Sequence, residues 1–108
     1  MELDIRTEGD YTVISPRGEI DFHTSPWLRQ QIIDALGRGR DLLIDMTAVS
    51  FIDSSAIASL VEGLQRARDE QRRLVLAGLQ EAPTQVLHLT RLDTVFPIRE
   101  RVADWLEA

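Results

Sequence analysis

Ser54 and Ser55 are the residues in this sequence whose types and spacing could support chemistry. They follow Asp53 directly, where the pattern predicts that a helix begins shortly after a strand has ended. The first turn of a helix has unpaired N–H groups and a partial positive charge, so a phosphate attached to a serine there would meet hydrogen-bond donors. Asp and Ser before a helix are also the usual residues of an N-cap. The residues alone leave two interpretations open, a phosphorylation site and a purely structural cap, and the cap is the more common.

Other catalytic or metal-binding chemistry finds little support. All twelve basic residues are arginine and there is no cysteine, which excludes a thiol nucleophile, a zinc-thiolate site and the lysine of a phosphate-binding P-loop. The two histidines, His23 and His88, have no partner at metal-ligand spacing. Ser54, His23 and Asp21 do not indicate a hydrolase triad, because the Gly-x-Ser-x-Gly sequence is missing. We expect no catalytic residue, no metal site and no cofactor, and therefore no enzyme.

Charge and composition restrict the partners and the compartment. The 108 residues carry a formal net charge of -6, which disfavours binding to nucleic acid and to anionic membrane surfaces. The length and the 44% hydrophobic content fit one folded domain, residues 1–108. No apolar run approaches the roughly 18 residues of a membrane span, and the acidic N-terminus does not resemble an export signal. We expect a cytoplasmic protein.

Two kinds of strand are predicted. Apolar and polar residues alternate on both sides of Gly9 and Asp10, as expected for a hairpin with one solvated face. Residues 42–44 and 74–77 form unbroken apolar runs, which are typical of strands buried on both faces of a sheet.

Helical spacing of apolar residues predicts four helices. The first is introduced by Thr24-Ser25-Pro26, where a hydroxyl followed by proline is expected to cap it, and ends near Gly37. The second follows Asp53, and the others lie after residue 82 and around residues 102–106. With a short strand allowed between the last two helices, the order is β-β-α-β-α-β-α-(β)-α, an α/β fold.

Three segments give the chain a resemblance to a known family. Residues 18–21 (Gly-Glu-Ile-Asp), 43–46 (Leu-Ile-Asp-Met) and 51–55 (Phe-Ile-Asp-Ser-Ser) resemble those of the anti-sigma factor antagonists, the stand-alone form of the STAS domain. Ala56 and Arg91 stand where glycine is common in that family. The resemblance implies a single STAS-type domain with a mixed sheet of about four to five strands, an N-terminal hairpin and helices packed mainly on one face.

The resemblance also implies a mechanism. The unmodified protein would bind an anti-sigma factor that is also a serine kinase and so free the sigma factor. Phosphorylation of Ser54, or alternatively Ser55, would abolish this binding, and a serine phosphatase would restore it. The alternatives are a STAS scaffold subunit of a stress-sensing complex or lipid-transport ATPase, and a nucleotide-binding STAS domain.

The same resemblance places residues 18–24 beside the loop that carries Ser54 and Ser55, here called the serine loop, on the docking surface. The protein would be a monomer or a weak dimer. Asp21 would form an ion pair with an arginine of the kinase, or would only stabilise a turn ahead of the helix; both interpretations stay open. The expected partner-binding residues are Asp21, His23, Thr24, Asp53, Ser54, Ser55 and Ala56.

Overall fold

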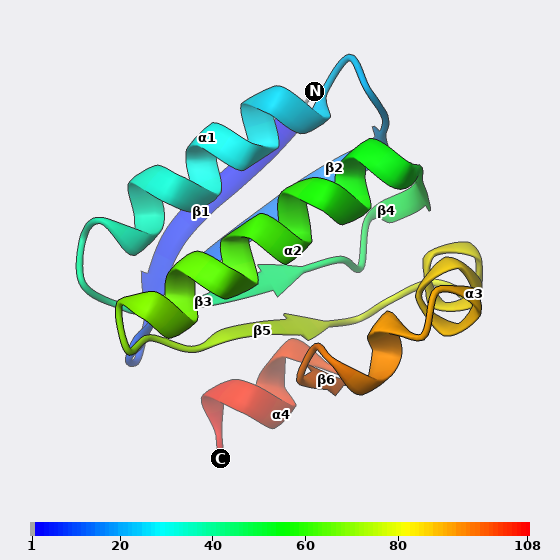
Figure 1. Ribbon diagram of the computed structural model, residues 1–108. Helices are drawn as coiled ribbons and strands as arrows, with labels where there is room; N and C mark the ends of the chain where they lie inside the picture. The colour runs from blue at the N-terminus through cyan, green and yellow to red at the C-terminus, as the bar shows by residue number, and fades with distance from the viewer. Residues whose placement is uncertain (1) are drawn as a thin grey trace.

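A six-stranded mixed sheet with helices on both faces makes up the computed structural model, which describes residues 2–108 (Figure 1). The strand order is β1-β2-β3-β5-β6, and β4 pairs with β2 outside this path. The elements are β1 (Glu2–Glu8), β2 (Tyr11–Ile20), α1 (Ser25–Leu36), β3 (Asp41–Asp45), β4 (Val49–Ile52), α2 (Ser54–Asp69), β5 (Leu74–Ala77), α3 (Glu81–Leu89), the 3-10 helix η1 (Leu92–Thr94), β6 (Ile98–Arg99) and α4 (Val102–Leu106).

The long strand β2 pairs with β1 along one side and divides its other side between β3 and β4. Residues 11–17 pair antiparallel with β1, which confirms the predicted hairpin, and residues 11–14 pair parallel with β3. After an irregularity at Gly18 and Glu19, its last residues pair parallel with β4. The sheet has six strands, whereas the sequence predicted about four to five. The prediction omitted β4, which is only four residues long. This extra strand ends beside β2 and thereby places the serine loop.

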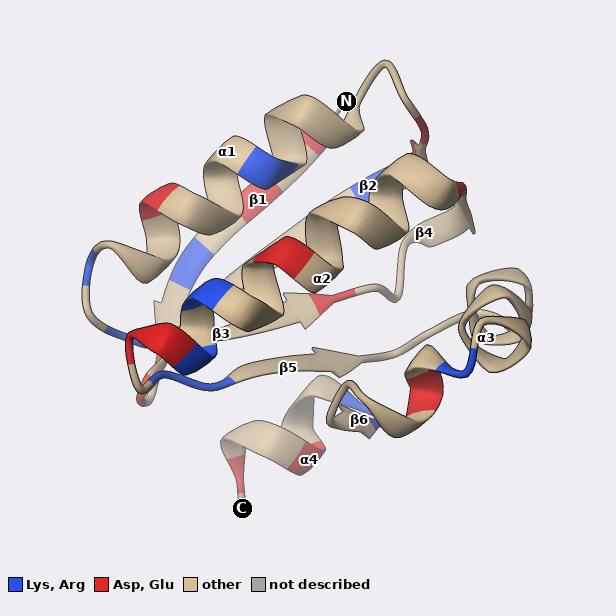
Figure 2. Cartoon of the chain, viewed as in Figure 1, with Lys and Arg blue, Asp and Glu red and all other residues tan. Residues whose placement is uncertain are grey.

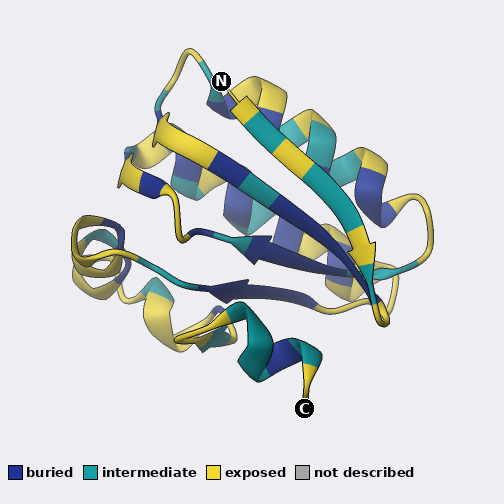
Figure 3. Cartoon of the chain, turned by 180° about the vertical axis from the view of Figure 1, so that it is seen from behind, coloured by how far each residue is buried: buried dark blue, intermediate teal, exposed yellow. Residues whose placement is uncertain are grey.

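The two faces of the sheet have separate hydrophobic clusters. Alternation along β3 sends Leu42 and Ile44 toward α1 and α2, while Leu43 points to the other face and packs with Trp105 of α4. This explains the unbroken apolar runs of the central strands. Figure 1 shows α1 and α2 side by side on one face, and Figure 3 shows α4 on the opposite one. The helices therefore lie mainly on one face, as predicted.

Trp105 fixes α4 to the sheet. The side chain is 6% exposed, and its indole N–H donates a hydrogen bond of 2.9 Å to the carbonyl of Leu76 in β5. The guanidinium groups of Arg99 and Arg73 lie 4.1 Å and 5.1 Å from the ring centroid, within the range of cation–π attraction. Apolar packing, a hydrogen bond and two arginine contacts therefore all hold the indole in place.

Gly63 of α2 packs closely against Ile32 of α1. A Cβ atom at this position would lie 2.8 Å from Cγ2 of Ile32, which is shorter than a van der Waals contact. Any larger residue would push the two helices apart, and their first turns carry the loops described below.

Arg91 has a left-handed backbone conformation, with φ of 61°. Such a conformation strains a residue with a Cβ atom by about 1 to 2 kcal/mol, whereas glycine adopts it freely but loses about 0.5 to 1 kcal/mol more backbone entropy on folding. We expect Arg91→Gly to raise the free energy of unfolding in urea by up to about 1 kcal/mol. Arg91→Ala keeps the strained conformation and should not raise the free energy of unfolding. If both variants raised it equally, the loss of the arginine charge would be the cause and the strain would not.

Candidate functional site

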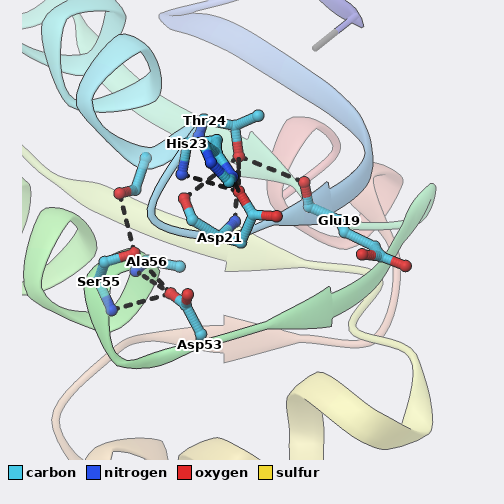
Figure 4. A network of polar contacts seen from close by, with 8 residues as sticks. Glu19, Asp21, His23, Thr24, Asp53, Ser55 and Ala56 are labelled. Carbon is cyan, nitrogen blue, oxygen red and sulfur yellow. Dashed lines mark hydrogen bonds and ion pairs between the residues drawn. The ribbon is translucent and has the colours of Figure 1, made fainter.

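Two loops lie side by side at one end of the sheet, one after β2 and one after β4 (Figure 4). The parallel pairing of β2 and β4 aligns their ends, and the N–H of Asp53 donates a 3.2 Å hydrogen bond to the carbonyl of Ile20. The structure therefore brings together the two segments that the sequence singled out, residues 21–24 and residues 53–56.

Asp53 is the N-cap of α2, which confirms the structural interpretation of this residue. Its Oδ1 accepts hydrogen bonds from the N–H groups of Ser55 and Ala56, at 2.9 Å and 3.1 Å, and from the Ser55 hydroxyl at 2.5 Å. The Ser55 hydroxyl first, and then the backbone N–H groups of Ala56, Ser55 and Phe22, hold the pKa of Asp53 below its ordinary value of 3.8 against the opposing effect of burial. Asp53 is thus a fixed negative charge at the start of the helix.

The two serines differ in how available their hydroxyl groups are. Ser54 is exposed, and the described residues 2–108 provide no hydrogen bond to its hydroxyl. Ser55 is half-buried; its hydroxyl donates to Asp53 and accepts a 2.9 Å hydrogen bond from the hydroxyl of Ser25. Of these two serines, Ser54 is the exposed one, and its hydroxyl has no partner among the described residues.

One expectation about this helix end is wrong. A phosphate here was expected to meet unpaired N–H groups, but the Asp53 carboxylate already accepts those of Ser55 and Ala56. An aspartate N-cap satisfies the donors that an incoming anion would otherwise use. A phosphate on Ser54 would therefore add its charge next to an existing carboxylate, with few free donors to offset it.

Asp21 stabilises the first loop through its own backbone. Its Oδ1 accepts hydrogen bonds from the N–H groups of His23 and Thr24, at 2.9 Å and 3.3 Å, which is the pattern of an Asx turn. None of these bonds uses Oδ2. The turn interpretation is thus present in the structure, and one carboxylate oxygen remains outside it.

The Thr24 hydroxyl does not cap α1, contrary to the sequence prediction. It accepts the N–H of Asp21 at 3.0 Å and lies 3.3 Å from the carbonyl of Glu19, and α1 has no side-chain cap. The hydroxyl is thus used inside the loop, where it contacts Asp21 and Glu19. The predicted helix end is confirmed, with Gly37 as the C-cap.

The predicted surface residues are not equally exposed. His23 is exposed, with its Nδ1 3.8 Å from Oδ1 of Asp21. Ala56 is fully buried in the core, so its side chain cannot contact a partner. The prediction omitted two exposed aromatic residues: Phe22, at 68% exposure, lies in the first loop, and Phe51, at 44%, lies in β4 two residues before Asp53.

Sequence signals could have identified both aromatics. Phe22 stands among polar residues of a predicted turn, where no core position is available, and its ring packs on His23 with 4.1 Å between centroids. Phe51 precedes Ile52 in a strand, where neighbouring side chains point to opposite faces, and Ile52 is buried. Exposed aromatics on a loop end are typical of protein-binding surfaces.

The end of the molecule with the two loops carries the acidic residues Glu19, Asp21 and Asp53 (Figure 4). At the other end of α2, acidic and basic residues are mixed (Figure 2), and the last turn carries Arg66 and Arg68. Within residues 2–108, no group of three or more His, Cys, Asp or Glu side chains is arranged to hold a metal ion. None of the helices in this described part is long and apolar enough to cross a membrane.

We expect Asp53→Asn to remove part of the acid sensitivity of the protein. The pKa of Asp53 is lower in the folded than in the unfolded chain, so its charge stabilises the fold above pH 3.8, and this stabilisation is lost as the pH falls through the folded pKa. Asn caps a helix about as well as Asp, so stability at neutral pH should change little, whereas Asp53→Ala should cost about 1 kcal/mol. Urea unfolding at neutral pH and at about pH 3 measures the difference. Equal acid-induced losses in wild type and Asp53→Asn would contradict it.

Comparisons with known proteins agree with this architecture. A model of the STAS domain matches residues 2–105. The anti-sigma-B factor antagonist of Listeria monocytogenes is 31% identical over 91 residues, which are 83% of this chain and 80% of that protein. The anti-sigma-B factor antagonist of Bacillus subtilis is 24% identical over 98 residues, 91% of this chain and 90% of that protein.

Solved structures share the fold. The crystal structure of an anti-sigma factor antagonist from Mycobacterium paratuberculosis has a TM-score of 0.87 and 28% identity, over 95% of this chain and 88% of that one. SpoIIAA of Bacillus, solved in its phosphorylated form, has a TM-score of 0.71 and 19% identity over 91% of each chain. At that identity the likeness to SpoIIAA concerns the fold alone.

Proposed function

This chain belongs to the STAS domain family, and we propose that it is an anti-sigma factor antagonist that acts by partner switching. In this mechanism, the unmodified protein binds an anti-sigma factor with serine kinase activity, which then releases its sigma factor. The kinase phosphorylates Ser54, the complex dissociates, and a serine phosphatase restores the binding form. The chain is the substrate and the regulator, and performs no catalysis itself.

The observation that carries this proposal is the state of Ser54. Its hydroxyl is exposed at the first position of α2, beside the ionised Asp53 and next to a loop that presents further polar and aromatic side chains. A kinase needs a hydroxyl that reaches its active site, and Ser54 meets this requirement. The names of the relatives, anti-sigma-B factor antagonists, support the same role.

The remaining exposed residues suggest how the partner is held. Phe22 offers apolar area that an interface can bury, and the Asp21 carboxylate has an oxygen outside the turn that can pair with an arginine. His23 and Thr24 complete this loop, while Ala56 contributes only its buried methyl group to the core. The proposed docking surface therefore consists of residues 21–24 together with Asp53 and Ser54.

Phosphorylation with each candidate anti-sigma kinase and ATP tests the proposal. Intact-mass and peptide mass spectrometry should find one phosphate on the wild type, located on Ser54, and only a slow residual reaction at Ser55 on Ser54→Ala. Ser55→Ala is the matched control, since it removes the neighbouring hydroxyl and should still be phosphorylated. Undiminished phosphorylation of Ser54→Ala would move the site elsewhere, and absence of phosphate with every candidate kinase would refute the proposed mechanism.

A further inference from the structure

Ser25, the first residue of α1, connects three parts of the molecule although it is only 3% exposed. Its N–H donates a 2.7 Å hydrogen bond to the carbonyl of Asp21, and its carbonyl accepts a 3.3 Å bond from the hydroxyl of Ser59. Its own hydroxyl donates to the hydroxyl of Ser55 at 2.9 Å. Every polar group of this buried residue is therefore engaged; one of these bonds ends at Asp21 in the docking surface, and another at Ser55 beside it.

The hydroxyl of Ser25 begins a directed chain of hydrogen bonds. Ser25 donates to Ser55, and Ser55 donates its single hydroxyl proton to Asp53 at 2.5 Å. Ser55 thus acts as acceptor and donor at once, which fixes its side chain in one rotamer, turned toward Ser25 and Asp53. The neighbouring Ser54 has no such engagement among the described residues.

We infer that Ser25 is a positioning residue that selects Ser54 over Ser55 as the phosphorylated serine, by holding the Ser55 hydroxyl turned inward. This inference rests on the proposed phosphorylation. Two adjacent serines at the start of one helix offer a kinase nearly equivalent backbone positions, so the choice between them needs a difference in the hydroxyl groups. The bonds from Ser25 and to Asp53 supply that difference, and the bond from Ser25 is the one that can be removed without removing the N-cap of α2.

Packing alone does not account for a serine at this position. A buried hydroxyl is costly unless it is hydrogen-bonded, and alanine would fill nearly the same volume without that requirement. The Ser25→Ala variant should therefore fold normally, and thermal unfolding followed by circular dichroism checks this. Its effect should appear at Ser55.

The test measures phosphorylation of Ser55 by the kinase that modifies this protein in the assay above. In a Ser54→Ala background, adding Ser25→Ala should raise the initial rate at Ser55 about fivefold, which corresponds to about 1 kcal/mol for one hydrogen bond. Ser59→Ala in the same background is the matched control, because Ser59 also contacts Ser25 but lies outside the chain to Asp53. An unchanged rate at Ser55 in the Ser25→Ala variant would overturn the inference while leaving Ser54 as the site.

A second measurement needs no kinase. Side-chain coupling constants from NMR should show one dominant χ1 rotamer of Ser55 in the wild type and in Ser59→Ala, and rotamer averaging in Ser25→Ala. A single unchanged rotamer in Ser25→Ala would overturn the inference. If no kinase phosphorylates the wild type, the proposed function fails, and selection of Ser54 falls with it whatever the rotamers show.

Discussion

Phosphorylation of Ser54 is expected to weaken binding to the anti-sigma partner about a hundredfold, or about 3 kcal/mol. The phosphate adds about 1.5 to 2 negative charges beside the ionised Asp53. Because Asp53 already accepts the N–H groups of Ser55 and Ala56, few backbone donors remain to offset the new charge. Like charges brought together in an interface cost several kcal/mol. Calorimetry with the unmodified and the phosphorylated protein measures the change.

Two controls separate the charge effect from other causes. Ser54→Ala should bind the partner as tightly as the unmodified protein does, because the hydroxyl itself carries no charge. Amide NMR spectra of the two forms should differ only near residues 20–24 and 51–57. Affinities within threefold of one another, or shifts spread across β1, β3 and β5, would contradict a switch that acts by surface charge.

Trp105→Ala is expected to lower the free energy of unfolding by about 3 to 5 kcal/mol, as for other large buried aromatics. The substitution leaves a cavity against Leu43 and Val75, removes the hydrogen bond to the Leu76 carbonyl, and takes away the ring on which Arg99 lies. Urea unfolding followed by circular dichroism measures the loss.

Trp105→Phe divides this effect into its parts. The variant keeps an aromatic ring but has no N–H, so it should cost about 1 to 2 kcal/mol, mainly for the unpaired carbonyl. A loss below 1 kcal/mol in Trp105→Ala would mean that α4 contributes little to the stability of the sheet.

Much of the fold could be predicted because apolar runs and local residue preferences in the sequence indicate it. Residues 42–44 and 74–77 are apolar on both faces, and the structure places them in the centre of the sheet. The hairpin at Gly9 and the cap at Asp53 follow from local residue preferences, which act over a few residues and are visible in one sequence. The family was recognisable from three short segments, and the match over residues 2–105 confirms it.

The rest depends on contacts between distant segments. The strand β4 is held by β2, about 30 residues earlier, and its own four residues show no clear alternation. The hydroxyl of Thr24 turns to Asp21 and away from the helix, a choice set by the loop that surrounds it. The bond between Ser25 and Ser55 joins two helix starts, and no local pattern reveals it.

The division of β2 between β3 and β4 has a consequence for how such proteins can diversify. The first residues of β2 pair with β3, which in turn pairs with β5. The docking end depends instead on the last residues of β2, which form three register pairs with β4. Insertions or exchanges near Thr47 and Ala48 can thus tilt β4 and change the spacing between Asp21 and Ser54. New partner preferences can evolve at this end while the β2–β3 and β3–β5 pairing stays unchanged.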